Sequence, residues 1–498
     1  MTERDRRGFL KVSGVAGFGL LGCGGNPAGG TPSPDAGATT DTGAVDAPGP
    51  EATPDGGGAT PWWLQGNYGP VADELEATSL EVLGALPPEL DGVYLRNGPN
   101  PRSGRSGHWF VGDGMLHGVR LQGGRALWYR NRYLQTSLYR GMPFGRSGGF
   151  PDVRDTAGNT ALALHAGRLL ALYEASLPLE VRADLSTVGL YDFAGMLEGP
   201  MSAHPKSDPA TGELFFHGYG VVPPYVKVHR VDAQGRHQRV TNVMTRGATM
   251  VHEFQLTPRW MVVLDLPIVF DLGTLARSPL PYRWRDDYPA RVGLVPREGD
   301  GSARWFDIEP CYIFHTFNAF EEGERVVLEG CRHPRLWVDG PDLLASEPMP
   351  HRWTLDLSTG RAQEQRLTDQ LAEFPQVASA VRGRPHRYGY ALNVGRSPDG
   401  VHLGDARAYL KHDRVMDRWT RHDLGEGRQP DEPTFVPRPG GRSEDDGWIF
   451  GFVYDRAGDR SELVVLDAMN FTAPAVARVR LPRRVPHGFH GLWVPAMA

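Results

Sequence analysis

Short β-like runs separated by turn residues recur through most of the chain and constrain its fold more than any other feature. These runs are rich in aromatic and β-branched residues, and the clearest are GVYLRNG (92–98), HWFVGDG (108–114), ELFFHGYG (213–220), WMVVLDLP (260–267), ERVVLEG (324–330), WIFGFVYD (448–455) and ELVVLDA (462–468). No long stretch has sustained helical periodicity, and the 63 glycines and 42 prolines of the chain supply turn residues. The pattern predicts an all-β fold.

The first 60 residues do not belong to this pattern. Residues 1–23 contain a pair of arginines, the apolar stretch VSGVAGFGLLG and then Cys23. We interpret them as a twin-arginine-like export signal that ends in a lipoprotein cleavage site, with Cys23 as the lipidated residue. The alternative is an uncleaved N-terminal segment. The first interpretation predicts a membrane-anchored lipoprotein facing the periplasm or the cell surface.

Residues 24–60 consist mainly of Gly, Pro, Ala, Thr and Asp, and we expect them to form a disordered tether. Residues 61–498 are expected to form one large domain. The chain has a formal net charge of −6. No basic stripe of the kind that binds nucleic acid is visible in the sequence. The number and spacing of the short runs fit either a β-propeller or a pair of sandwiches.

Four histidines lie in short apolar segments bounded by Gly, Pro or Thr: His204, His252, His315 and His490. They are 48, 63 and 175 residues apart in turn. Residues so far apart can bind one metal only if distant strands converge, as the inner strands of propeller blades do, so the spacing favours the propeller. A single histidine in an apolar strand is more often a core residue than a ligand. A zinc-protease helix would need a histidine at position 256, which is Leu256.

Several longer motifs occur in an order that resembles the carotenoid cleavage oxygenases, a family that includes lignostilbene-cleaving enzymes. They are HWFVGDGMLHG, SAHPKSDPATGELF, MVHEFQLTPRWMVVLDLP, FHTFNAFEEGERVVLEG, EFPQV, DEPTFVPR and VPHGFHGLWV. The resemblance extends from about Trp62 to Trp493. It implies a seven-bladed β-propeller with a cap of loops and short helices over a non-haem Fe(II) on the axis.

The resemblance also implies the site residues. The iron ligands would be His204, His252, His315 and His490, and three glutamates would hydrogen-bond to the ligands: Glu174, Glu373 and Glu432. Neutral imidazoles suit ferrous iron, and a carboxylate that accepts the second ring N–H fixes the tautomer and the ring angle. The implied reaction is the cleavage of an alkene C=C bond with O2, which gives two carbonyl products.

Two positions bear on the substrate and on membrane contact. In the stilbene-cleaving branch a lysine binds the phenol oxygen, but Leu138 lies near that position here and residues 130–205 contain no lysine. A carotenoid or apocarotenoid is therefore favoured over a hydroxystilbene.

The segment 268–284 interrupts the series of short strands and is expected to be an insertion. It either packs as a crossover loop or offers Ile268, Val269, Phe270 and Leu272 to a membrane for uptake of a lipophilic substrate.

Three further alternatives concern chemistry. A propeller that only binds a partner or a pigment would predict damage at the four ligand positions or the three glutamate positions, and all seven are intact. A hydrolase with another metal would require an activated nucleophile or a carboxylate ligand, and the four histidine motifs offer only imidazoles. Cys311 and Cys331 either pair in an oxidising compartment or remain buried thiols, and the sequence favours thiols.

Overall fold

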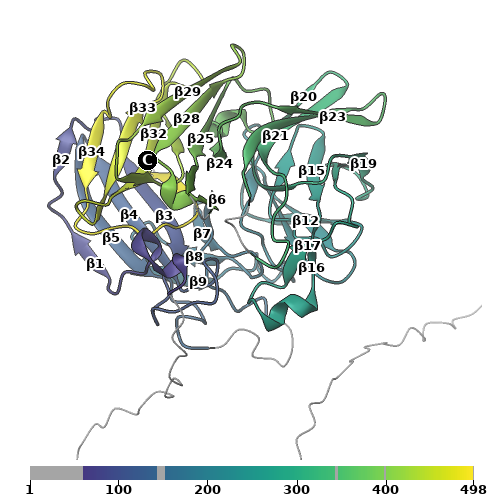
Figure 1. The fold of residues 1–498 in the computed structure, drawn as a ribbon, viewed down its shortest axis with the longest axis horizontal. Helices are drawn as coiled ribbons and strands as arrows, with labels where there is room; N and C mark the ends of the chain where they lie inside the picture. Colours follow the sequence, from purple (N-terminus) through teal and green to yellow (C-terminus); the bar gives the residue numbers. More distant parts are fainter. Residues whose placement is uncertain (1–59, 143–151, 342–345, 398–399, 497–498) are drawn as a thin grey trace, which may run out of the picture. The chain divides into compact units, whose positions relative to one another are not determined.

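A computed structural model describes residues 60–142, 152–341, 346–397 and 400–496. Cys23 and the expected signal and tether up to residue 59 lie outside these ranges. The described part of the chain forms seven large antiparallel sheets and two two-stranded ribbons (Figure 1). The sheets are the blades of a seven-bladed β-propeller, as predicted.

The first blade joins the two ends of the domain. Its strands lie in the order β1 (Leu75–Ala77), β5 (Arg125–Tyr133), β4 (Gly114–Gln122), β3 (Gly92–Pro99) and β35 (Gly491–Pro495). The C-terminal strand β35 pairs with β3 from Gly92↔Pro495 to Arg96↔Gly491. The N-terminal strand β2 (Val82–Gly84) in turn pairs with β34 (Ala477–Arg480) of the last blade. The ring is therefore closed twice, by one strand from each end.

Blades two to six are each built from four strands of one chain segment, and a two-stranded ribbon interrupts the fourth and the sixth. The second has β6 (Ala161–His165), β7 (Arg168–Leu172), β8 (Leu179–Val181) and β9 (Thr187–Leu190). The third has β10 (Lys206–Ser207), β11 (Leu214–Tyr219), β12 (Val226–Val231) and β13 (His237–Val243). The fourth has β14 (Phe254–Leu256), β15 (Trp260–Asp265), β18 (Arg291–Pro296) and β19 (Arg304–Asp307).

The remaining blades follow the same plan. The fifth has β20 (Tyr312–Glu322), β21 (Arg325–His333), β22 (Met349–Asp356) and β23 (Arg361–Arg366). The sixth has β24 (Ala372–Gln376), β25 (Tyr388–Asn393), β28 (Ala408–Asp413) and β29 (Arg418–Asp423). The seventh has β30 (Arg428–Pro430), β31 (Thr434–Pro437), β32 (Gly447–Asp455), β33 (Arg460–Asp467), β34 and β2.

The ribbons and helices are small. The ribbons pair β16 (Ile268–Phe270) with β17 (Tyr282–Trp284), and β26 (Gly395–Ser397) with β27 (Gly400–His402). The helices of the described ranges are 3₁₀ turns: η1 (Trp62–Leu64), η2 (Gly66–Tyr68), η3 (Leu272–Ala276), η4 (Ser379–Val381) and η5 (Leu403–Asp405). Within those ranges, no helix has the length and apolar character needed to cross a bilayer.

The hydrophobic core is divided among the interfaces between blades. Seven large clusters of buried side chains each join strands of two neighbouring blades, so every interface around the ring is filled. This explains the sequence pattern. The middle strand β32 is buried at eight of its nine residues because both faces contact other blades, whereas the outer strand β23 alternates between half-buried and exposed.

One stretch that the sequence pattern predicts to be a strand is mostly not a strand. Residues 108–113 of HWFVGDG form turns, and the strand begins only at Gly114. A Cβ at Gly112 would lie 3.2 Å from the Pro99 side chain and 3.1 Å from that of Pro101, so the chain bends tightly there.

The two cysteines of the described ranges do not form a disulfide bond. Cys311 and Cys331 are buried free thiols, in agreement with the favoured alternative.

Candidate metal centre

The four predicted ligands lie on the innermost strands of four blades. His315 is part of β20, and His204, His252 and His490 come directly or shortly before β10, β14 and β35. Each of these strands is at an end of its sheet. The start of an inner strand lies close to the propeller axis, so residues far apart in sequence meet there.

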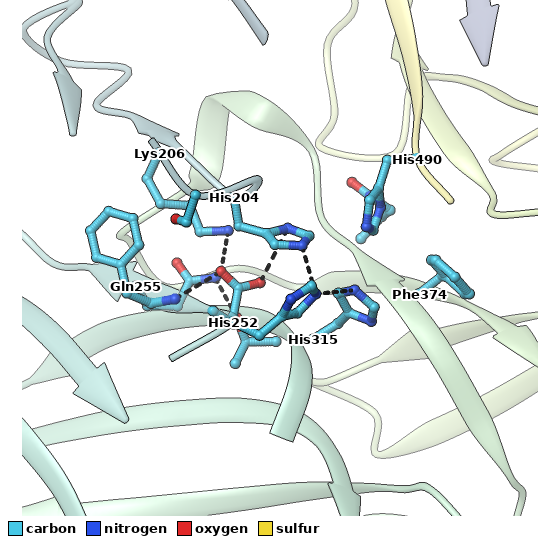
Figure 2. Close-up of polar contacts among 12 residues, drawn as sticks. His204, Lys206, His252, Gln255, His315, Phe374 and His490 are labelled. Atoms are coloured by element: carbon cyan, nitrogen blue, oxygen red, sulfur yellow. Dashed lines mark hydrogen bonds and ion pairs between the residues drawn. The ribbon is translucent and has the colours of Figure 1, made fainter. Parts of the chain in front are cut away.

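The four imidazole rings face one another (Figure 2). The Nε2 atoms of His204 and His252 are 2.9 Å apart, and those of His252 and His315 are 3.4 Å apart. The ring of His490 lies 4.6 Å from that of His204 and 4.9 Å from that of His315, centroid to centroid. Ligand nitrogens of His204, His315 and His490 lie within 4.8 Å of one another.

Three glutamates bind the outer nitrogens of three of these rings. The Nδ1 atom of His252 is 2.5 Å from Glu174 Oε2, that of His315 is 2.6 Å from Glu373 Oε2, and that of His490 is 2.9 Å from Glu432 Oε1. Glu174 follows β7, Glu373 lies in β24, and Glu432 lies between β30 and β31. Each of the seven blades thus contributes one of the seven predicted residues.

This arrangement fits a metal ion. A carboxylate only accepts hydrogen bonds, so the Nδ1 atoms of His252 and His315 carry the ring protons and their Nε2 atoms present lone pairs. Two such lone pairs 3.4 Å apart repel each other unless a cation lies between them. Nitrogens bound about 2.1 Å from one metal at right angles are about 3 Å apart, which is the separation found here.

Burial and the carboxylates set the charge of the site. Burial holds the pKa of His204 well below its usual range, and the neighbouring His252, His490 and His315 lower it further. Burial also lowers the pKa of His490, although Glu432 opposes it. Burial alone would raise the pKa of Glu373, but charge and hydrogen bonds from His315 and His333 hold it low. Burial lowers the pKa of His315 too, but the charge and hydrogen bond of Glu373 outweigh it, so that this pKa is raised. Burial therefore favours the neutral form of His204 and His490, and Glu373 is held ionised.

Sequence reasoning missed four residues of this network. His333 Nε2 is 2.8 Å from Glu373 Oε1, and Gln376 donates to Glu432 Oε1 at 2.7 Å. Lys206 and Glu253 form an ion pair beside His204. Three of the four were visible in the sequence, because Lys206, Glu253 and Gln376 lie within three residues of a predicted site residue. His333 had no such signal, since only the pairing of β20 with β21 brings it to the site.

Aromatic side chains pack against the histidines. Phe314 lies 5.2 Å from the ring of His252, and Phe374 stacks on His315 at 5.0 Å. From Phe314 the aromatic contacts continue through Phe110, Trp337 and Phe489. Trp109, in a turn where the sequence pattern predicts a strand, packs on Phe489 at 4.7 Å. The surroundings of the metal centre are thus apolar on this side.

The chain is similar to a known protein family over most of its length. Residues 68–495 match the family described as Retinal pigment epithelial membrane protein. A carotenoid cleavage oxygenase of Mycobacterium tuberculosis is 37% identical, and the match covers 87% of this chain and 97% of that protein. An apocarotenoid-15,15'-oxygenase of Synechocystis is 31% identical over 86% of this chain and 96% of that protein.

Solved structures have the same fold. A variant of the Synechocystis apocarotenoid oxygenase aligns with a TM-score of 0.78 and 29% identity, covering 87% of this chain and 98% of that one. A lignostilbene dioxygenase of Pseudomonas brassicacearum aligns with a TM-score of 0.79 and 28% identity over the same shares. A cobalt-substituted form of the Synechocystis enzyme aligns with a TM-score of 0.77 and 29% identity, covering 86% of this chain and 97% of that one.

Replacing Glu373 should weaken metal binding. We expect Glu373→Gln to lower the Fe(II) or Co(II) affinity about 10–100-fold, because the amide cannot accept hydrogen bonds from both His315 and His333. Anaerobic metal titration would measure this. Glu180→Gln is the control, since Glu180 binds only the exposed Arg168 in the described contacts. Equal affinities in both variants would contradict the assigned role of Glu373.

Proposed function

The chain belongs to the carotenoid cleavage oxygenase family, and we propose that it cleaves a C=C bond of a carotenoid or apocarotenoid with O2 at a non-haem Fe(II). The observation that carries the proposal is the convergence of four imidazoles, three of them bound to carboxylates. The reaction converts one alkene and one O2 into two aldehydes or ketones.

We propose iron as the metal because of the ligand set. Four neutral ligands leave the ion its full charge, which disfavours oxidation to Fe(III), and imidazole is a ligand that suits ferrous iron. His204, His252, His315 and His490 would hold it. When bound, ferrous iron supplies the reducing electrons that make O2 reactive toward an alkene.

The side chains around the metal have two roles in this proposal. Glu174, Glu373 and Glu432 hold the ring protons on Nδ1, so that each Nε2 stays free to bind the metal. Phe374, Phe314 and the aromatic residues beyond Phe314 exclude water and offer flat apolar surfaces to an extended conjugated chain. An apolar polyene loses no hydrogen bonds when it enters such surroundings, whereas a polar substrate would.

The choice of a polyene over a hydroxystilbene rests on charge. Leu138 is half-buried in the turn after β5 and offers no cation to a phenol. Lys206 is the nearest lysine in sequence to the expected position, and its ammonium is bonded to Glu253. The similarity to the lignostilbene dioxygenase structure keeps stilbene cleavage as the second candidate.

Product analysis tests the proposal. Residues 61–498 loaded with Fe(II) should convert a carotenoid or an apocarotenoid aerobically into aldehydes identified by chromatography and mass spectrometry. Replacement of His315 by Ala should abolish turnover. Aldehydes from a hydroxystilbene alone would contradict the polyene preference and support the second candidate. An iron-loaded protein that cleaves none of the three would contradict the assigned activity.

We also propose that the chain is exported and attached to a membrane through a lipid on Cys23. The motif at residues 1–23 supports this, and a lipophilic substrate gives membrane attachment a purpose. Expressed in a host with twin-arginine export, the full chain should fractionate with membranes and Cys23→Ser should not. Equal distribution of the two proteins would contradict lipidation. Replacing both Arg6 and Arg7 by Lys should leave the protein in the cytoplasm.

The insertion β16–η3–β17 offers a second membrane contact, although a smaller one than the sequence suggested. Ile268 is fully buried, so for this residue the packed-loop alternative is right and membrane contact is wrong, whereas Val269 and Phe270 are half-buried. Leu272 and Leu275 on η3 are 68% and 50% exposed. We propose that these two leucines insert into the membrane interface.

Liposome binding tests this contact without the lipid anchor. For residues 61–498 we expect Leu272→Ser with Leu275→Ser to lower the fraction that sediments with liposomes, because the apolar contact is lost. Val415→Ser with Met416→Ser is the matched control, since these residues are 68% and 63% exposed on another turn. If both double variants lose the same amount of liposome binding, or neither loses any, the leucines of η3 make no specific contact with the membrane.

A further inference from the structure

One of the four histidines lacks the direct carboxylate partner that the other three have. For His252, His315 and His490, the distance from Nδ1 to the glutamate oxygen is 2.5–2.9 Å. For His204 the carboxylate in the described ion pairs is that of Glu253, whose Oε2 is 4.0 Å from Nδ1. This contact is too long for a hydrogen bond, yet it is short enough for a strong charge effect.

Glu253 is held in this position by two contacts to its other oxygen. Lys206 Nζ lies 2.6 Å from Oε1, and the backbone N–H of Phe254 donates to Oε1 at 3.0 Å. Glu253 is 2% exposed. Its Oε2 atom lies 4.0 Å from Nδ1 of His204. Figure 2 shows Lys206 and His204 on the same side of the cluster. The ion pair joins the third blade to the fourth, and each partner lies within two residues of a predicted ligand, His204 or His252.

We propose that Glu253 and Lys206 form a positioning pair for His204 and that they set the charge felt by the metal. Glu253 orients the His204 ring with Nδ1–H toward its carboxylate and Nε2 toward the metal. Lys206 cancels the negative charge that Glu253 would otherwise add to the site. This inference rests on the proposed Fe(II) centre.

The charge count explains why a cation is needed there. Glu174, Glu373 and Glu432 already place three carboxylates around a metal with neutral ligands. A fourth uncompensated carboxylate would stabilise Fe(III) over Fe(II), because the higher charge gains more from a nearby anion. The positive charge of Lys206 offsets the charge of Glu253, so that Fe(III) is not favoured over Fe(II) by this carboxylate. Arg382 feels the charges of both Glu253 and Glu432, which oppose the lowering of its pKa by burial. Lys206 and Arg382 both line a cavity of about 570 Å³.

The proposal predicts shifts of opposite sign from the two members of the pair. Lys206→Met should lower the midpoint potential of the bound iron, so that Fe(III) is favoured about threefold or more at the wild-type midpoint. Glu253→Gln should raise the potential, because it leaves the ammonium uncompensated. The double variant should return close to the wild-type value. A purely structural pair would disturb the site in the same direction in all three variants.

The experiment is an anaerobic redox titration of the iron-loaded protein with mediator dyes, followed by the electron paramagnetic resonance signal of high-spin Fe(III). Lys206→Arg should keep the wild-type potential because it keeps the charge. Lys206→Gln removes the same charge and replaces Lys206→Met if that variant does not fold. Arg259→Met is the matched control, since Arg259 lines the same cavity but binds Glu321.

Each result is decisive. Opposite shifts that cancel in the double variant would support the proposal. Iron-loaded variants with unchanged potentials, or with shifts of one sign, would overturn it and leave the proposed activity intact. A shift in Arg259→Met equal to that in Lys206→Met would show a general effect of the cavity charge, and it would also overturn the proposal. Failure of the wild-type protein to bind iron would overturn the proposed function itself.

Discussion

Closure of the seven-bladed ring is the constraint on which the rest of this structure depends. The C-terminal strand pairs with β3 and the N-terminal strand β2 pairs with β34, so both ends of the domain hold the ring shut. With every interface between blades filled, the inner strands cannot separate, and their first residues remain together at the axis. The metal centre is thus a product of the whole ring, since each blade supplies one of its seven residues.

Within that ring, charge decides what the centre can bind. The Nε2 lone pairs of His252 and His315 lie 3.4 Å apart, an arrangement that is unfavourable without a cation. The carboxylates behind them fix the tautomers, and their summed negative charge favours an oxidised metal. The Lys206–Glu253 pair belongs to this balance, because it adds an orienting carboxylate without adding net charge. Phe314, Phe374 and the aromatic residues beyond Phe314 keep one side of the centre apolar.

The sequence predicted the fold class, the number of blades and all seven residues that meet at the site. Local strand patterns alone left a propeller and two sandwiches open. The spacing of the four histidines favoured the propeller, and the ordered motifs implied its seven blades. Prediction failed where tertiary contacts overrule local pattern. HWFVGDG looks like a strand but bends beside Pro99 and Pro101, and Ile268 looks available to a membrane but lies in the core. His333 reaches Glu373 only through strand pairing, which no local signal reveals.

The central claim is that four histidines hold one iron, and X-ray absorption at the iron edge tests it most directly. Residues 61–498 loaded anaerobically should bind one Fe(II) per chain, with about four imidazole nitrogens near 2.1 Å and no sulfur ligand. Replacing any one of the four histidines by Ala should remove one imidazole from the spectrum or release the metal. A spectrum with two or fewer imidazoles, or one unchanged by these replacements, would contradict the account.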